Sequence, residues 1–223
     1  DLHSFPTRRS SDLTLWAVFM GYFCGKQDMQ TLSAAQRSSF LLSNGLGGYA
    51  SVTAAYSVPR CDQGILVAAV KAPNERITMV HRMRETLQMG ENQVFLSSQS
   101  FAGRKVQEDG YRYLAGFSYE ELPVWTYQER GVTVKRTLCM VQEANTAAVL
   151  YEIENRSERD CTLQAEPFLK FAPKEEALKE KKEFTYQRGS ITDGKYTLYL
   201  STDGNLRKRA AVWQTLAYPE DAK

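Results

Sequence analysis

The segment Ser43–Ala50 is the most unusual local sequence of the chain, because three of its eight residues are glycine. Its Gly45, Gly47 and Ala50 fit the G-x-G-x-x-A spacing of dinucleotide-binding loops. Such a loop must open a helix, whose N-terminus receives the pyrophosphate. The next segment, Ser51–Pro59, is instead rich in β-branched and aromatic residues and ends in a proline. We therefore predict a tight glycine turn between strands, not a nucleotide site.

Histidine is too scarce for most metal and triad chemistry, since the chain has only His3 and His81. His81 lies close in sequence to Arg82, Arg84 and Glu85 and could be an acid–base centre. A catalytic triad needs an ordered trio, and no nucleophile motif accompanies this histidine. The favoured interpretation is a partly buried histidine on a strand.

Two adjacent acidic pairs, Glu108–Asp109 and Glu120–Glu121, could supply the carboxylates of a glycosidase. That chemistry needs the two groups on opposite sides of a bound sugar. Neighbouring residues of a strand point to opposite faces of the sheet, so an adjacent pair does not form such a site. We expect both pairs to be solvated loop charges.

Aromatic residues could bind a sugar by stacking on its apolar face. They concentrate in three short runs: Tyr111–Tyr113, Phe117–Tyr119 and Trp125–Tyr127. At alternate positions of a sandwich, such residues more often fill the core. We expect Tyr119 and Trp125 to be exceptions, because Leu122–Pro123 between them indicates a rim loop. The glycine turn offers a further possibility, in which Asn44 and Tyr49 reach a substrate-facing rim.

The elements that must position these residues are strands, because apolar and polar residues alternate with period two. The clearest runs are Val132–Met140, Ala147–Ile153, Leu163–Phe171 and Tyr196–Leu200. In the first run, Arg136 is the one polar residue on the apolar face. The spacing predicts an all-β fold, a large antiparallel β-sandwich of the supersandwich type with few short helices.

Two further segments depart from this alternation. Gly64–Val70 is continuously apolar and is predicted to be a strand buried on both faces. Lys174–Glu183 is highly charged with almost no apolar stripe, so we predict a solvated loop or a short surface helix.

The composition excludes several classes of protein. Of 223 residues, 43% are hydrophobic and 24% are charged, which is ordinary for a globular chain. The net charge of +2 gives no reason to expect a nucleic acid or a membrane surface as partner. The four cysteines have no C-x-x-C spacing, so we expect buried thiols in a reducing, cytoplasmic environment. We expect no metal and no organic cofactor.

Residues 1–19 are expected to be foreign to the protein. Ser4–Leu13 resembles the translation of a sequencing-adapter oligonucleotide, and Met20 is the expected start. The apolar run Leu13–Cys24 follows an arginine pair and mimics a signal peptide. We reject that interpretation, since no convincing cleavage site follows and a membrane span needs ~20 residues.

Several blocks in order resemble the N-terminal domain of the prokaryotic type of glycogen-debranching enzyme, an amylo-α-1,6-glucosidase. These blocks are Phe40–Ser51, Arg60–Ala68, Ala72–Arg76 with Val80–Arg82, Glu108–Leu114 and Leu122–Tyr127, with Gly25–Asp28 near the start. The resemblance runs from about Met20 to at least Asp203. One position departs from it: the family often has histidine where this chain has Gln63. If that histidine has a functional role in the family, the role is in doubt in this chain; if it only makes a hydrogen bond, a glutamine could replace it.

The resemblance implies that residues 20–223 are a β-sandwich domain truncated before a helical α/α toroid, which carries the catalytic carboxylates. No catalytic residue is therefore expected in this chain, and α-glucan and the toroid of the same polypeptide are its expected partners. Candidate substrate-binding residues are Asn44, Tyr49, Arg60, Tyr119 and Trp125. The alternative is a stand-alone, non-catalytic carbohydrate-binding module. A purely structural interaction domain and the sandwich of a related glucoamylase or disaccharide phosphorylase remain rivals.

Overall fold

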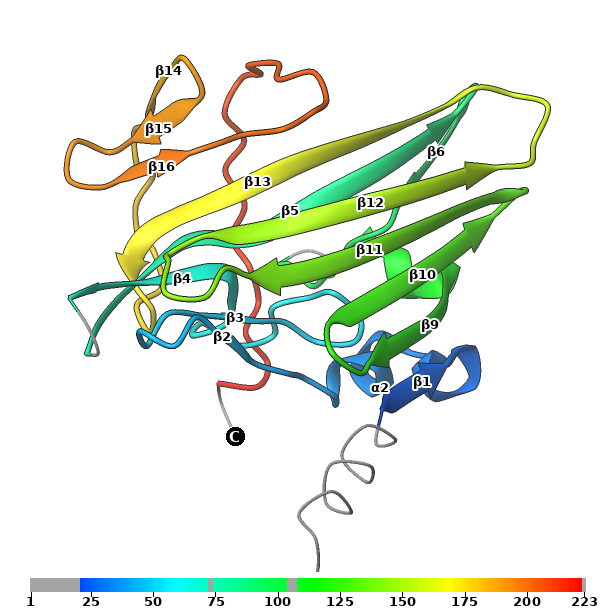
Figure 1. Ribbon diagram of the computed structural model, residues 1–223, viewed down its shortest axis with the longest axis horizontal. Coiled ribbons are helices and arrows are strands. Elements are labelled where there is room, and N and C mark those ends of the chain that lie inside the picture. The colour runs from blue at the N-terminus through cyan, green and yellow to red at the C-terminus, as the bar shows by residue number, and fades with distance from the viewer. Residues whose placement is uncertain (1–20, 72–73, 104–107, 222–223) are drawn as a thin grey trace, which may run out of the picture.

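The computed structural model describes residues 21–71, 74–103 and 108–221. Two large antiparallel sheets pack face to face, with a small sheet beside them (Figure 1). The all-β sandwich predicted from the alternation is confirmed. The expected foreign tail lies outside the described residues. Among the residues that are described, no helix has the length and apolar character to cross a bilayer.

The first large sheet has five strands in the described part of the chain. In spatial order they are β1 (Tyr22–Gly25), β9 (Leu114–Tyr119), β10 (Pro123–Glu129), β11 (Val132–Met140) and β12 (Ala147–Asn155). β11 has the predicted bounds, and the turn before it is formed by Arg130 and Gly131 at positive φ.

The second large sheet has six described strands. In spatial order they are β13 (Cys161–Pro173), β5 (Glu75–Met89), β4 (Gly64–Lys71), β3 (Tyr49–Ser51) and β2 (Leu42–Ser43), with β6 (Asn92–Phe95) also paired to β5. β4 is buried along six consecutive residues, as predicted for the continuously apolar segment.

The remaining described elements are short. They are the small sheet β14 (Thr185–Gln187), β15 (Ser190–Thr192) and β16 (Thr197–Tyr199), the pair β7 (Ser98–Gln99) and β8 (Glu108–Asp109), and the helices η1 (Lys26–Met29), α2 (Leu32–Gln36) and η2 (Gly110–Tyr113). The charged segment 174–183 is not helical, which confirms the loop interpretation.

An ion pair lies in the core between the two large sheets. Arg136 of β11 is 0% exposed, and its guanidinium lies 3.1 Å from the carboxylate of the equally buried Glu85 on β5. The Tyr151 hydroxyl donates to Glu85 Oε1 at 2.7 Å, and Arg136 Nη1 donates to the Tyr127 hydroxyl at 2.8 Å. The polar interruption in the β11 pattern is therefore a charge with a cross-sheet partner.

A second ion pair lies on the other face of β5. Arg82 donates to both carboxylate oxygens of Glu108, at 2.7 and 2.9 Å, and the Ser97 hydroxyl donates to Glu108 at 2.9 Å. The prediction that Glu108 is a solvated loop charge is wrong, because its side chain is buried and paired with Arg82. The sequence did not indicate this pair, since the arginine lies far away along the chain. Glu120 and Glu121 are exposed, as predicted.

The C-terminal segment closes this face of the six-stranded sheet (Figure 1). Its backbone bonds to the segment around Phe101: Ala102 N–H donates to Thr215 O at 3.0 Å, and Ala217 N–H donates to Ser100 O at 3.1 Å. The segment therefore adds ordered contacts beyond the last strand.

Candidate functional site

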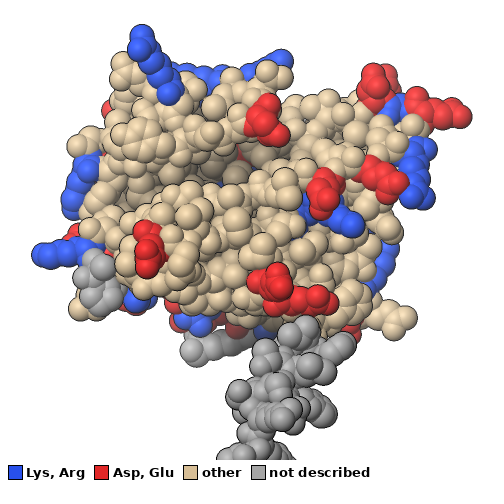
Figure 2. All heavy atoms as spheres, in the orientation of Figure 1, with Lys and Arg blue, Asp and Glu red and all other residues tan. Residues whose placement is uncertain are grey.

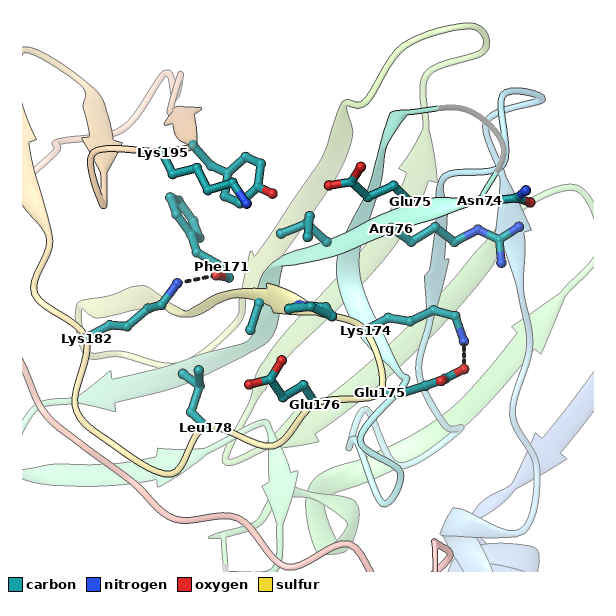
Figure 3. Close-up of a pocket in the computed structure, with 14 residues that line it drawn as sticks. Asn74, Glu75, Arg76, Phe171, Lys174, Glu175, Glu176, Leu178, Lys182 and Lys195 are labelled. Atoms are coloured by element: carbon teal, nitrogen blue, oxygen red, sulfur yellow. Dashed lines mark hydrogen bonds and ion pairs between the residues drawn. The ribbon is translucent and has the colours of Figure 1, made fainter.

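A cavity that carries aromatic and charged side chains together lies where β13 ends and β5 begins (Figure 3). Its volume is about 500 Å³. It is lined by residues 74–77 from the start of β5, residues 171–176 from the end of β13, and Leu178, Lys182, Lys195 and Tyr196. Three segments distant in sequence thus build one hollow.

An irregularity in β13 forms the floor of the cavity. The pairing of β13 with β5 shifts between Leu169 and Ala172, and Phe171 adopts a positive φ of 46°. This bulge turns the Phe171 ring against Phe184, with ring centroids 5.1 Å apart. Lys182 donates to the carbonyl oxygen of Phe171 (Figure 3). The loop after β13 is therefore attached to the strand it leaves.

The side of the cavity formed by the small sheet is fixed through Asp193. Lys182 Nζ donates to the Asp193 carboxylate at 2.8 Å, and the backbone N–H of Tyr196 donates to it at 2.9 Å. Burial opposes the charge on Asp193, but these hydrogen bonds lower the pKa of its carboxyl. The turn that presents Lys195 and Tyr196 is thus held in place by a carboxylate.

The cavity wall combines hydrogen-bond donors and acceptors with apolar surface. The charged side chains are Glu75, Arg76, Lys174, Glu175, Glu176, Lys182 and Lys195. Lys195 Nζ lies 4.8 Å from the centre of the Tyr196 ring, and Lys174 pairs with Glu175. Such a wall suits a ligand with apolar faces and many hydroxyls. In the described residues no group of His, Cys, Asp and Glu could hold a metal ion.

The predicted glycine turn joins β2 to β3, with Gly45 and Gly47 at positive φ. Asn44 in this turn is fully buried. Its Nδ2 donates to Ala144 O at 2.9 Å, and its Oδ1 accepts from the N–H of Leu46 at 3.0 Å. Asn44 therefore locks the turn onto the β11–β12 connection and presents no polar atom to a ligand.

Arg76 connects this turn to the cavity. Its Nε donates to Gly47 O at 2.7 Å, and its guanidinium lies 6.0 Å from the centre of the Tyr49 ring. Tyr49 is buried and its hydroxyl donates to Asp62 O at 2.6 Å; burial raises its pKa to about 12. Arg60 is half exposed and pairs with the Asp62 carboxylate at 2.8 Å. Of the three predicted residues Asn44, Tyr49 and Arg60, only Arg60 has an accessible polar end.

The other two predicted residues lie elsewhere, at a groove of about 430 Å³ that is lined by Tyr22, Phe40 and Tyr119. Tyr119 is half-buried and lines the groove. Trp125 is 0% exposed and lies beneath it; its Nε1 donates to Ala54 O at 3.0 Å. The expectation that Trp125 lies on a rim is corrected, because its side chain points into the sandwich.

The cavity residues Phe171, Lys182 and Tyr196 were not among the sequence candidates. Phe171 and Tyr196 fitted the apolar faces of predicted strands, and Lys182 belonged to a segment predicted as a loop. No local pattern signals the bulge that brings them together.

Gln63 supplies a hydrogen bond inside the loop before β4. Its side chain is buried, and its Oε1 accepts the backbone N–H of Arg60 at 3.2 Å. A histidine ring nitrogen can also accept a hydrogen bond. Gln63 therefore has a hydrogen-bonding role within this loop.

His81 is buried behind the C-terminal segment, as the strand interpretation predicted. Its Nε2 shares a hydrogen bond of 3.1 Å with the Tyr218 hydroxyl. Burial, with further contributions from the charges of Lys170 and Arg82, lowers the pKa of His81 to about 3. The histidine is therefore neutral at every pH near neutrality.

This shift predicts a loss of stability in acid. The unfolded histidine binds a proton below its ordinary pKa of 6.5, whereas the folded one stays neutral until about 3. Falling pH therefore favours the unfolded state. Between pH 7 and pH 5, the free energy of unfolding should drop about 2 kcal/mol more in the native chain than in His81→Gln. Urea titrations at the two pH values measure the free energy of unfolding of each protein. An equal drop between pH 7 and pH 5 in the native chain and in His81→Gln would contradict the buried neutral state.

The comparison with protein families gives one match: the family model described as glycogen debranching enzyme N terminal matches residues 39–223. Neither a curated protein nor a solved structure shows significant similarity to the chain. The family match includes both large sheets except β1, and all residues that line the cavity.

Proposed function

Because the chain belongs to the glycogen debranching enzyme N-terminal family, we propose that it is the N-terminal domain of an enzyme that hydrolyses α-1,6-glucosidic branch points. Its role is to position the α-glucan, without cleaving it. The observation that carries this proposal is the family match over a segment that contains the whole cavity.

The lining of the cavity supports a glucan as ligand. A glucose unit has an apolar face and hydroxyls at its edge, which suit an aromatic ring beside planar charged groups. Tyr196 supplies the ring, while Arg76 and Glu176 supply a donor and an acceptor. Charges of both signs are scattered over the face shown in Figure 2, without a patch of one sign. An uncharged polysaccharide fits this surface better than a nucleic acid does.

Hydrolysis belongs, in this proposal, to a helical toroid domain of the same polypeptide. Glycoside hydrolysis needs two carboxyl groups across the scissile bond. Glu175 and Glu176 are neighbours in sequence, and Glu175 is already paired with Lys174. These residues are therefore assigned to binding. The described cysteines are free thiols, which agrees with the cytoplasmic location that we propose with this function.

Calorimetric titration with maltoheptaose tests the binding role. We expect saturable binding that Tyr196→Ala weakens about tenfold, because the variant removes one stacking ring. Tyr199→Ala is the matched control: Tyr199 lies three residues further on, is 81% exposed and is not part of the cavity. This control should bind like the native chain.

Three outcomes would contradict the proposal. Absence of binding would remove the glucan-positioning role. A loss of affinity in Tyr119→Ala but not in Tyr196→Ala would move the glucan to the aromatic groove. Release of glucose from a branched limit dextrin by the purified chain would contradict positioning without cleavage.

A further inference from the structure

A cysteine and a lysine meet in the interior beneath the loop that precedes β4. Cys61 is 5% exposed and Lys170, near the end of β13, is 3% exposed. Lys170 Nζ lies 3.3 Å from Cys61 Sγ. This contact brings a nucleophilic sulfur and an amine together, far from each other in sequence and outside the cavity.

Three hydrogen-bond acceptors, one of them the sulfur, fix the position of the Lys170 amine. Besides Sγ, its Nζ donates to Cys61 O at 3.1 Å and to Lys174 O at 2.9 Å. Among the described residues, no carboxylate lies within ion-pair distance of this amine. A buried ammonium without a carboxylate is costly, and burial lowers the pKa of Lys170 accordingly. The ammonium that donates these three hydrogen bonds therefore loses a proton more readily than that of an exposed lysine, and this loss gives the nucleophilic amine.

The surroundings hold the pair from the opposite side. The Asp221 carboxylate accepts the backbone N–H of Cys61 at 3.1 Å. Tyr218 and its hydrogen-bonded His81 lie next to the same cysteine and lysine. The C-terminal segment thus fixes the loop that carries the sulfur, and this holds Cys61 Sγ close to Lys170 Nζ.

We propose that Cys61 and Lys170 form a reducible covalent crosslink when the protein meets a peroxide. In the first step the thiolate attacks one peroxide oxygen; a sulfur–oxygen bond forms, the oxygen–oxygen bond breaks, and water leaves. In the second step the lone pair of the amine attacks the sulfenic sulfur. A sulfur–nitrogen bond forms, and the hydroxyl leaves with one amine proton as water. The thiol and the amine each lose one hydrogen, and one peroxide is reduced to two waters.

The reverse reaction needs a dithiol such as dithiothreitol. Its thiolate attacks the sulfur, the amine leaves and takes up a proton, and the second thiol closes a disulfide in the reagent. Cysteine and lysine are restored. The crosslink joins the loop before β4 to β13 and does not depend on glucan binding.

Peptide mass spectrometry of the native chain after hydrogen peroxide treatment tests the proposal. We expect a linked peptide pair that contains Cys61 and Lys170, with the summed mass reduced by two hydrogens, about 2 Da. Trypsin should no longer cleave after Lys170, and dithiothreitol should restore both the cleavage and the separate peptides. Lys170→Met should remove the linked pair, whereas the neighbouring Lys174→Met should keep it.

The native chain alone can test the crosslink, even if a variant fails to fold. The proposal is overturned if Cys61 is recovered only as thiol or as its sulfinic or sulfonic acid while trypsin still cleaves after Lys170. It is overturned equally if the linked pair persists in Lys170→Met, because another amine would then be the reacting group.

Discussion

Glu85→Gln is expected to lower the free energy of unfolding by about 3–5 kcal/mol, although it changes the size of the side chain hardly at all. The substitution leaves the guanidinium of Arg136 inside the sandwich without a carboxylate. A buried charge that loses its partner costs far more than an exposed pair contributes.

The geometry around Arg136 explains why this charge cannot escape to water. Its guanidinium lies 3.4 Å from the centre of the Tyr56 ring and 4.9 Å from that of Tyr127. Burial opposes the charge, but the Glu85 carboxylate outweighs that effect and raises the pKa of Arg136. Burial likewise raises the pKa of Glu85, and the guanidinium opposes that rise. Because Arg136 stays protonated, we take Glu85 as ionised at neutral pH.

Urea denaturation of three variants measures the effect. Glu166→Gln is the control, since Glu166 pairs with Arg84 and Arg209 near the surface and should cost less than about 1 kcal/mol. The double variant with Glu85→Leu and Arg136→Met should recover much of the loss, because it removes both charges. Equal stability of Glu85→Gln and Glu166→Gln would contradict the cross-sheet ion pair.

This pair also shows how far the sequence could predict the fold. The alternation in β11 is a local pattern, so its bounds and buried face could be predicted from the sequence. The polar interruption at Arg136 was visible as well, but its partner was not, because Glu85 lies on a strand of the opposite sheet. Glu108 was misjudged for the same reason: Arg82, which neutralises it, is distant along the chain.

The candidate site was less predictable than the strands. A buried asparagine that locks a turn and an exposed asparagine that binds a ligand have the same local sequence, so Asn44 could not be assigned. The cavity itself depends on the bulge at Phe171 and on the salt bridge between Lys182 and Asp193. Both features arise from pairing between segments, which single-sequence patterns do not record.

The chemistry of Trp125 suits both a sugar-binding rim and a packed core, and the structure buries it in the core. Trp125→Ala should lower the free energy of unfolding by about 3–5 kcal/mol, because it leaves a cavity the size of an indole in the core. The ring packs against Phe40, Tyr56 and Phe117, with centroids 5.5, 5.0 and 5.1 Å away. The substitution also leaves Ala54 O without the hydrogen bond that the indole N–H donates.

Trp125→Phe separates the two contributions, since it keeps most of the packing and removes only the hydrogen bond and part of the volume. It should cost about 1–3 kcal/mol in the same urea titration. Both variants should bind maltoheptaose like the native chain under conditions where they are fully folded, because Trp125 lies beneath the groove and outside the cavity. If Trp125→Phe binds more weakly while its stability is unchanged, the indole contacts the ligand, and the burial of Trp125 in the unliganded chain would not describe the bound state.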